Sequence, residues 1–254
     1  MDVLITAILL SGGTGTRMNL STPKQYLEVN DKPIICYSLY ELLSCKRIDK
    51  LIVVADTKWH DLILDLINKH VSKNKFIGFS KPGLNRQLSI YNSLLDLNNI
   101  SEEDDYVLIH DAARPLITQE LINGLIQKSK NHDGAMPVLH VKDTMYYMNP
   151  DNKLSRLNRD CIYAGQSPEI FKYGLYKYAN EQLISKSLLE DYKNNRCDEE
   201  TIKSQHIYKV SGSTEPALAI VMDIAIIDGD ENNFKISTMP DLEKFTDIIC
   251  RGDK

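Results

Sequence analysis

Short apolar runs alternate with amphipathic stretches along the first half of the chain, and this alternation is the strongest constraint on its fold. Five runs have the length and composition of buried strands: residues 4–10, 51–55, 76–79, 106–110 and 135–139. Between them, four stretches have apolar residues at helical spacing: 33–43, 61–70, 87–97 and 119–130. Strands that alternate with helices predict an α/β fold, with a mostly parallel sheet flanked by helices on both faces.

Three polar clusters directly follow predicted strands. A glycine-rich segment, 11–17, follows the first strand, residues 81–89 follow the third, and residues 111–115 follow the fourth. Because ligand sites of parallel sheets lie at the carboxyl ends of the strands, we expect the three clusters to lie together at that edge. The sequence therefore predicts one ligand site there.

The glycine-rich segment is suited to binding phosphate. Glycines let backbone N–H groups approach an anion closely, and Arg17 and Lys24 add two cations of different shape. The residues expected to contact phosphates are Ser11, Gly12, Gly13, Thr14, Gly15 and Thr16. The segment lacks the ending of a Walker loop and the third glycine of a dinucleotide fingerprint. It favours a nucleoside polyphosphate and phosphoryl or nucleotidyl transfer over the alternative, an ordinary glycine-rich turn.

Composition narrows the class of protein. A chain of 254 residues is expected to form one domain, 1–254. Its net charge of −5 argues against nucleic acid as a partner. The five cysteines include no Cys-x-x-Cys pair, so neither a disulfide framework nor a zinc site is indicated. The first apolar run is too short to span a bilayer and no basic region precedes it, so we expect a soluble cytoplasmic protein without a membrane partner.

The pattern changes after residue 139. Residues 141–148 and 154–163 are predicted as two strands around the polar turn 149–153, forming a hairpin arm at about 141–163. An isolated hairpin is only marginally stable in water, so we expect the arm to pack on a second subunit. Residues 173–205 are rich in Lys, Asn and Glu and predict helix, with a mobile loop near 194–200.

Seven motifs, in order along nearly the whole chain, resemble those of one enzyme family. They are Gly-Gly-Thr-Gly-Thr-Arg-Met (12–18), Pro-Lys-Gln-Tyr-Leu (23–27), Gly-x-x-Arg-x-x-Ser (83–89), His-Asp-Ala-Ala-Arg-Pro (110–115), Lys-Asp-Thr (142–144), Arg159 with Gln-Ser-Pro (166–168), and Asn-Phe-Lys-Ile-Ser (233–237). The chain resembles the CTP-dependent polyol-phosphate cytidylyltransferases, which act on D-ribitol 5-phosphate or 2-C-methyl-D-erythritol 4-phosphate. The resemblance implies a Rossmann-like α/β fold with a protruding β-hairpin dimerisation arm.

The reaction that this resemblance implies is attack by a phosphate oxygen of the polyol phosphate on the α-phosphorus of CTP, which yields a CDP-alcohol and pyrophosphate. Both reactants are anions, so fixed cations and in-line positioning lower the barrier. By resemblance the catalytic residues are Arg17, Lys24 and Lys235, and Mg²⁺ is expected as cofactor, bound mainly through CTP phosphates. For Lys235 the alternative is an ordinary edge-strand lysine.

The resemblance also assigns residues to the cytidine and to the acceptor. Gly83 and Ser89 would contact the base and the ribose, and Arg86 either joins them or only braces the loop. Asp111 would contact CTP, the hydroxyls of the acceptor and the surroundings of the metal. Its alternative role is to pair with Arg114 and hold the loop, and both roles are compatible.

The acceptor's phosphate is expected to meet Thr144, Arg159 and Ser167, which lie on or beside the arm. In the family the arm reaches into a partner subunit, so Thr144 and Arg159 would complete the neighbour's site in a homodimer. The chain departs from the family's pattern at 211–217. There, Thr214 or Ser213 is the candidate to replace the family's phosphate-binding threonine.

Two details bear on the acceptor and point in different directions. Residues 163–168 and the glycine-rich segment look closer to the ribitol-phosphate enzymes of wall-polymer synthesis, whereas residues 111–115 look closer to the methylerythritol enzymes of isoprenoid synthesis. We expect D-ribitol 5-phosphate, because residues 163–168 adjoin the predicted acceptor pocket, with 2-C-methyl-D-erythritol 4-phosphate as the alternative.

Two rival functions come from other classes. A non-catalytic nucleotide-binding regulatory protein is disfavoured because Arg17, Lys24 and Lys235 are all present. An NAD-dependent oxidoreductase would need the fingerprint that this chain lacks.

Overall fold

The computed structural model describes residues 3–14 and 21–252. Within them, one sheet of eight strands runs through the molecule: β1 (Ile5–Leu10), β4 (Lys50–Val54), β5 (Phe76–Ser80), β6 (Tyr106–Asp111), β7 (Gly134–His140), β10 (Tyr163–Gly165), β11 (Glu169–Lys172) and β12 (Ile224–Asp228). Their order is β10-β7-β11-β6-β1-β4-β5, and β12 also pairs with β7. Neighbours among β6, β1, β4 and β5 are parallel, whereas β10 and β11 run antiparallel to their partners. The sheet is therefore mixed and mostly parallel.

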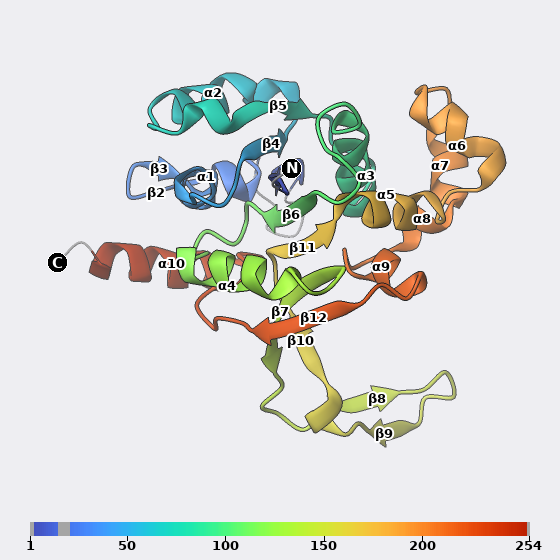
Figure 1. The fold of residues 1–254 in the computed structure, drawn as a ribbon. Coiled ribbons are helices and arrows are strands. Elements are labelled where there is room, and N and C mark those ends of the chain that lie inside the picture. Colours follow the sequence, from blue (N-terminus) through green and yellow to red (C-terminus); the bar gives the residue numbers. More distant parts are fainter. Residues whose placement is uncertain (1–2, 15–20, 253–254) are drawn as a thin grey trace.

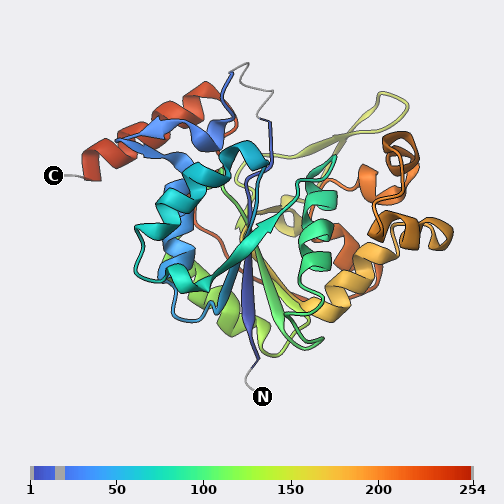
Figure 2. The same cartoon turned by 90° about the horizontal axis from the view of Figure 1, so that it is seen from above.

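Helices cover both faces of this sheet (Figures 1 and 2). The helices that pack on it are α1 (Ile34–Ser44), α2 (His60–Asn68), α3 (Arg86–Asp96), α4 (Gln119–Ser129) and α5 (Tyr173–Glu181). On β1, Ala7 and Leu9 belong to the core shared with α1, α2 and α4, and Ile8 belongs to the core shared with α3 and α5. Because both faces are buried, β1 contains a single polar residue, the buried Thr6, and shows no alternation of apolar and polar residues. The five strands and four helices predicted from the sequence are confirmed.

A third apolar cluster fixes the C-terminal part of the chain beside the sheet. Helix α10 (Met239–Gly252) buries Phe245 completely, together with Ile236 and Ile34. The Phe245 ring also meets the edge of the Tyr37 ring, with centroids 5.1 Å apart. In addition, the Ile236 N–H donates to the carbonyl of Ala113 at 2.8 Å. This packing brings residues 233–237 to the carboxyl end of β6.

The hairpin arm protrudes from the body of the molecule, as predicted (Figure 1). Its strands are much shorter than predicted, because only β8 (Tyr146–Met148) and β9 (Leu154–Arg156) pair with each other. Residues 159–161 form a 3₁₀ turn, η5 (Arg159–Cys161), and β10 then returns to pair with β7 of the main sheet. The expectation of one strand over 154–163 is therefore wrong. Strands do begin and end this segment, at β9 and β10, but the residues between them include the 3₁₀ turn and pair with neither sheet.

The polar segment after α5 is helical. It contains α6 (Lys186–Lys193), α7 (Glu199–Ser204) and α8 (His206–Lys209), and α9 (Glu215–Ala219) follows. The expected loop is limited to residues 194–198, because Asp198 caps α7 by accepting from the N–H of Thr201 at 2.7 Å. The Tyr192 hydroxyl donates to Asn92 at 2.9 Å and so attaches α6 to α3.

The remaining short elements are β2 (Glu28–Val29), β3 (Lys32–Pro33), η2 (Lys24–Tyr26), η3 (Thr57–Trp59) and η4 (Lys73–Lys75). β2 and β3 pair with each other as a small antiparallel ladder outside the main sheet. None of the helices in the described ranges has the length and apolar character needed to cross a membrane.

Candidate active site

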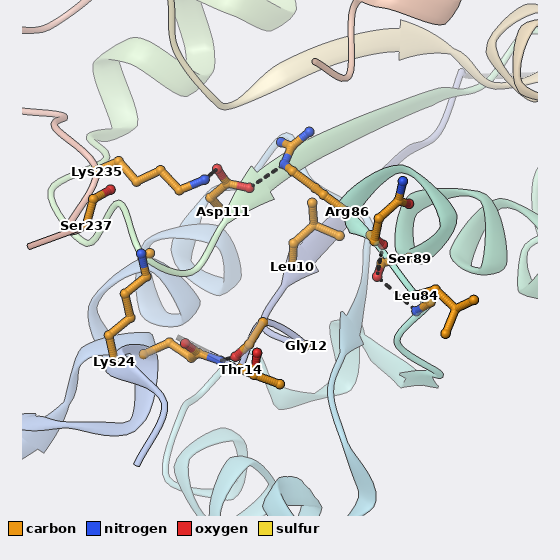
Figure 3. A pocket seen from close by; sticks show the side chains of 15 residues that line it. Leu10, Gly12, Thr14, Lys24, Leu84, Arg86, Ser89, Asp111, Lys235 and Ser237 are labelled. Atoms are coloured by element: carbon orange, nitrogen blue, oxygen red, sulfur yellow. Dashed lines mark hydrogen bonds and ion pairs between the residues drawn. The ribbon is translucent and has the colours of Figure 1, made fainter. Parts of the chain in front are cut away.

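A cavity of about 330 Å³ opens at the carboxyl edge of the sheet, where β1 and β6 end. The three polar clusters that follow strands all contribute to its wall: Gly12, Gly13, Gly83, Arg86, Asp111 and Ala113. Figure 3 shows side chains from these clusters facing a common space, with Lys235 and Ser237 from the C-terminal segment beside them. Segments that are far apart in the sequence therefore meet at one place, at the edge expected for a ligand site.

The glycine-rich segment rests on its neighbours through specific contacts. The Ser11 N–H donates to the carbonyl of Val54 at 2.9 Å, and the Ser11 hydroxyl donates to the Tyr26 hydroxyl at 2.7 Å. Position 12 requires glycine, because a Cβ there would lie 2.7 Å from the ring of Pro82. The segment is thus seated directly against the loop that follows β5.

Lys24 lines the cavity at the start of the 3₁₀ helix η2. Pro23 precedes it with a φ of −58°, a value that its ring fixes in advance. Gly13 and Thr14 also line the cavity. The predicted phosphate contacts Gly15 and Thr16 and the predicted catalytic residue Arg17 lie outside the described residues.

The loop after β5 holds Gly83 and Ser89 close together. The Ser89 hydroxyl accepts from the Gly83 N–H at 2.9 Å and donates to the carbonyl of Asn85 at 2.8 Å. Asn85 caps α3, because its side chain accepts from the N–H of Leu88 at 2.8 Å. A Cβ on Gly83 would lie 2.5 Å from the Leu88 Cβ, so the first turn of α3 already requires glycine there. Both predicted cytidine contacts line the cavity, and Ser89 has its proton committed within the loop.

Asp111 lies between two cations at the end of β6. Arg86 Nε is 2.9 Å from Asp111 Oδ1, and Lys235 Nζ is 2.7 Å from Asp111 Oδ2 (Figure 3). The Arg86 guanidinium also contacts a second carboxylate, because its Nη2 is 3.6 Å from Glu169 Oε2. The suggested pairing of Asp111 with Arg114 is not the arrangement in the structure, because Arg114 donates to the carbonyl of Asn233 at 2.6 Å. Two carboxylates and two cations thus form a charge-balanced cluster beside the cavity.

The burial of this cluster shifts its protonation equilibria. Burial alone would raise the pKa of the Asp111 carboxyl, but Arg86 and Lys235 outweigh it and hold this pKa well below the usual range. Burial alone would lower the pKa of Arg86, and Asp111 and Glu169 outweigh it and raise the pKa. Asp111 and Arg86 are therefore both charged at neutral pH.

His110 is fully buried behind the cluster. Its Nε2 lies 3.0 Å from the carbonyl of Arg114, so this nitrogen carries the proton and donates. Burial lowers the pKa of His110 to about 4, which keeps the ring neutral. The Ser167 hydroxyl lies 3.4 Å from His110 Nδ1 and accepts from the N–H of Asp111 at 3.2 Å. The ring and this hydroxyl therefore support the backbone of the 110–114 loop.

Comparison with known proteins identifies the family. The family model described as IspD: 2-C-methyl-D-erythritol 4-phosphate cytidylyltransferase matches residues 5–194. The chain belongs to this family. A 2-C-methyl-D-erythritol 4-phosphate cytidylyltransferase of Thermotoga neapolitana is 31% identical over 237 residues, 93% of each chain. A ribitol-5-phosphate cytidylyltransferase of Streptococcus pneumoniae is 30% identical over 248 residues, 94% of this chain and 96% of the relative.

The fold agrees with solved structures of the IspD family. The crystal structure of 4-diphosphocytidyl-2C-methyl-D-erythritol synthase from Anaerococcus prevotii has a TM-score of 0.75 at 22% identity, covering 98% of this chain and 96% of that chain. This likeness supports the α/β architecture with its mostly parallel sheet.

The residues that the IspD family resemblance assigns to the acceptor do not line this cavity together. Thr144 and Arg159 are exposed on the arm, and the Arg159 guanidinium donates to the carbonyl of Lys142 at 2.9 Å. Thr214 is buried and donates to Glu169 Oε1 at 3.1 Å, and the neighbouring Ser213 hydroxyl donates to Glu169 Oε2. Ser167 supports the backbone at Asp111. Within one chain, the acceptor candidates are therefore divided among the arm, the surroundings of Glu169 and the end of β6, where Asp111 lines the cavity.

Glu169 was not identified from the sequence. Its side chain is only 10% exposed, and it accepts hydrogen bonds from two hydroxyls and faces Arg86. The available signal was a glutamate that opens the apolar run Glu-Ile-Phe after a proline, a pattern that indicates a buried carboxylate in need of partners. Gln25 and Gln166 lie inside recognised motifs, but no local pattern indicates which backbone atoms they contact.

Proposed function

We propose that this chain catalyses cytidylyl transfer from CTP to a polyol phosphate, with release of pyrophosphate. The observation that carries the proposal is the placement of Lys24, Lys235 and Arg86 around one cavity at the carboxyl edge of the sheet, with Asp111 paired to two of these cations. Membership of a cytidylyltransferase family supports the same reaction.

In the proposed reaction, a phosphate oxygen of the acceptor attacks the α-phosphorus of CTP. The new oxygen–phosphorus bond forms as the bond to the bridging oxygen breaks, and the electron pair of that bond leaves with pyrophosphate. The nucleophile is already an anion, so no general base is required. The main barrier is repulsion between anions, which positioned cations reduce.

Each lysine has a distinct role in this proposal. Lys24 neutralises the triphosphate beside the glycine-rich segment, and Arg17 shares this role by resemblance. Lys235 neutralises the α-phosphate and the incoming phosphate. Asp111 orients the Lys235 ammonium at 2.7 Å before substrate binds, so that less reorganisation is needed in the transition state. Arg86 fixes the other oxygen of the same carboxylate.

Mg²⁺ is the proposed cofactor. Asp111 is the one carboxylate among the described residues of the cavity wall, and both of its oxygens already contact a cation. Across the described ranges, no group of three or more His, Cys, Asp or Glu side chains is placed to hold a metal. This donor set fits a Mg²⁺ ion carried by triphosphate oxygens and water, with Asp111 as one further ligand at most. The ion would neutralise phosphate charge.

D-ribitol 5-phosphate is the proposed acceptor, and 2-C-methyl-D-erythritol 4-phosphate is an equally supported alternative. Relatives of both names match this chain at 30–31% identity over more than 90% of its length. The two acceptors share a terminal phosphate and several hydroxyls, so the same cations serve either one. A direct comparison of rates decides between them.

We also propose a homodimer in which the arm packs on the partner subunit. Four large apolar or aromatic side chains of the arm are more than half exposed: Tyr146 at 56%, Tyr147 at 51%, Met148 at 55% and Leu154 at 60%. Apolar exposure of this kind on a two-stranded hairpin favours an interface. Thr144 and Arg159 lie on the same arm, which supports their contribution to the neighbour's acceptor site. We place the enzyme in the cytoplasm, where CTP is available.

The test is pyrophosphate release from CTP and Mg²⁺, with D-ribitol 5-phosphate, 2-C-methyl-D-erythritol 4-phosphate and glycerol 3-phosphate supplied separately. We expect release with one of the first two acceptors and little with glycerol 3-phosphate. CTP binding without release in any reaction would contradict the enzyme proposal and favour a nucleotide-binding regulatory protein. UTP in place of CTP tests the choice of base.

A further inference from the structure

Gln25 directly follows Lys24 in the sequence, and its side chain is buried rather than exposed. The residue is 4% exposed, and its Nε2 donates to the carbonyls of Ser11 and Gly13, both at 2.7 Å. Only the nitrogen of the amide can face two carbonyl oxygens, so this orientation is fixed by its partners. Both protons of the amide are therefore committed to the glycine-rich segment.

These two hydrogen bonds determine which way the peptide groups of the segment face. In a trans peptide, the C=O and the following N–H point in opposite directions. Because the carbonyls of Ser11 and Gly13 point to Gln25, the N–H groups of Gly12 and Thr14 point away from it. Gly12 and Thr14 line the cavity, and a backbone N–H that faces a cavity is a donor for an anion.

Gln166 makes the same kind of contact with a different loop. It is 5% exposed, and its Nε2 lies 2.9 Å from the carbonyl of Asp230 and 3.3 Å from that of Asn233. Its Oε1 also accepts from the Asp230 N–H at 3.0 Å. A Cβ at Gly229 would collide with the Gln166 amide oxygen, so the loop is packed tightly against this side chain. Lys235 follows Asn233 by two residues.

We infer that Gln25 and Gln166 are positioning residues for two separate parts of the site. This inference rests on the proposed cytidylyl transfer. Gln25 orients the backbone donors that receive the triphosphate, and Gln166 fixes the loop that carries Lys235. An amide is suited to both tasks because it binds carbonyls strongly without adding a charge beside the phosphates. The two glutamines therefore affect different kinetic constants.

The inference is tested with Gln25→Met and Gln166→Met, which remove the amide and keep an unbranched side chain of similar size. For Gln25→Met we expect the KM for CTP to rise about tenfold, with CTP binding weakened to match in calorimetry without acceptor. For Gln166→Met we expect kcat to fall about tenfold with CTP binding unchanged. Each variant is the control for the other.

Several outcomes would overturn the inference. It fails if both variants lose only thermal stability, or if both change the same constant. Gln25→Asn and Gln166→Asn, which keep the amide on a shorter side chain, replace any methionine variant that does not fold, and we expect the same separation of constants. If the unmodified protein releases no pyrophosphate with any acceptor, the proposed function fails, and the comparison of CTP binding still tests Gln25. Equal CTP affinity of the unmodified protein and Gln25→Met would then refute its role.

Discussion

Replacing Asp111 by asparagine tests the charge cluster directly. The change removes the negative charge that Arg86 and Lys235 share and leaves a side chain of almost the same shape. Arg86 keeps Glu169 as a partner at 3.6 Å, whereas Lys235 loses its carboxylate. The Asp111 side chain is 11% exposed, so water replaces little of what is lost.

The magnitude follows from this burial. Breaking a buried ion pair costs roughly 3–5 kcal/mol. Because Arg86 retains Glu169 and Lys235 is one-third exposed, we take the lower end, about 3 kcal/mol. For a chain of this length each kcal/mol lowers Tm by about 2–4 °C, so the expected decrease in Tm is about 6–12 °C.

The pH dependence has a defined sign. The pKa of Asp111 is lower in the folded state than in the unfolded state, so its contribution is complete above the unfolded value, about 4, and is lost as pH falls below it. The difference in stability between the unmodified protein and Asp111→Asn should therefore narrow as the pH is lowered from 5 toward 2.

The assay is thermal unfolding at pH 7, together with pyrophosphate release. Glu199→Gln is the matched control, because it removes a carboxylate 3.0 Å from Lys203 on the exposed surface of α7, where we expect no measurable change in Tm. A decrease in Tm for Asp111→Asn no larger than that for Glu199→Gln would refute the argument from buried, balanced charge.

Three further predictions concern single sites. The folded-state pKa of His110 is about 4, so the unfolded state takes up more protons as pH falls from 6.5, and stability should decrease by roughly 3 kcal/mol between pH 6.5 and 4. Urea unfolding at pH 6.5 and pH 4 should show this decrease in stability. An equal decrease in His110→Asn would disprove its assignment to His110. Lys24→Ala should lower turnover about 100-fold or more with an unchanged circular dichroism spectrum; an unchanged rate would show that the segment after β1 does not bind the triphosphate. The unmodified protein should sediment as the proposed homodimer and Met148→Asp as a monomer, and a dimer that persists in the variant would exclude the arm as the interface.

The main-sheet strands and the α-helices of the first 140 residues could be predicted because β1, β4 and β6 are almost wholly buried and each helix has one apolar face. Strand β11, with four residues, was not predicted. Glu169, the first residue of this strand, was missed for the same reason, since a short antiparallel strand after a proline has no periodicity of its own.

The candidate site was predictable in its location and less so in its contacts. Because each of the three clusters directly follows a predicted strand, the sequence places them at one edge of the sheet. The partners of Asp111, however, lie at positions 86 and 235, and no local sequence pattern joins these positions. Gln25 illustrates the same limit. Its motif was recognised, whereas its contacts with Ser11 and Gly13 depend on the path of the backbone between them.

The tip of the arm offers a place where the chain can be lengthened. Residues 149–153 close on themselves, because the Asn149 N–H donates to the carbonyl of Lys153 at 3.0 Å and the Lys153 N–H donates to the Asn149 side chain at 2.7 Å. A short tag inserted after Asp151 would leave β8, β9 and the cavity in place. The base of the arm allows no such change, because β10 is followed at once by Gln166. An insertion at the tip would therefore provide a place for a label. An insertion at the base would instead disturb Gln166, which supports the Lys235 loop.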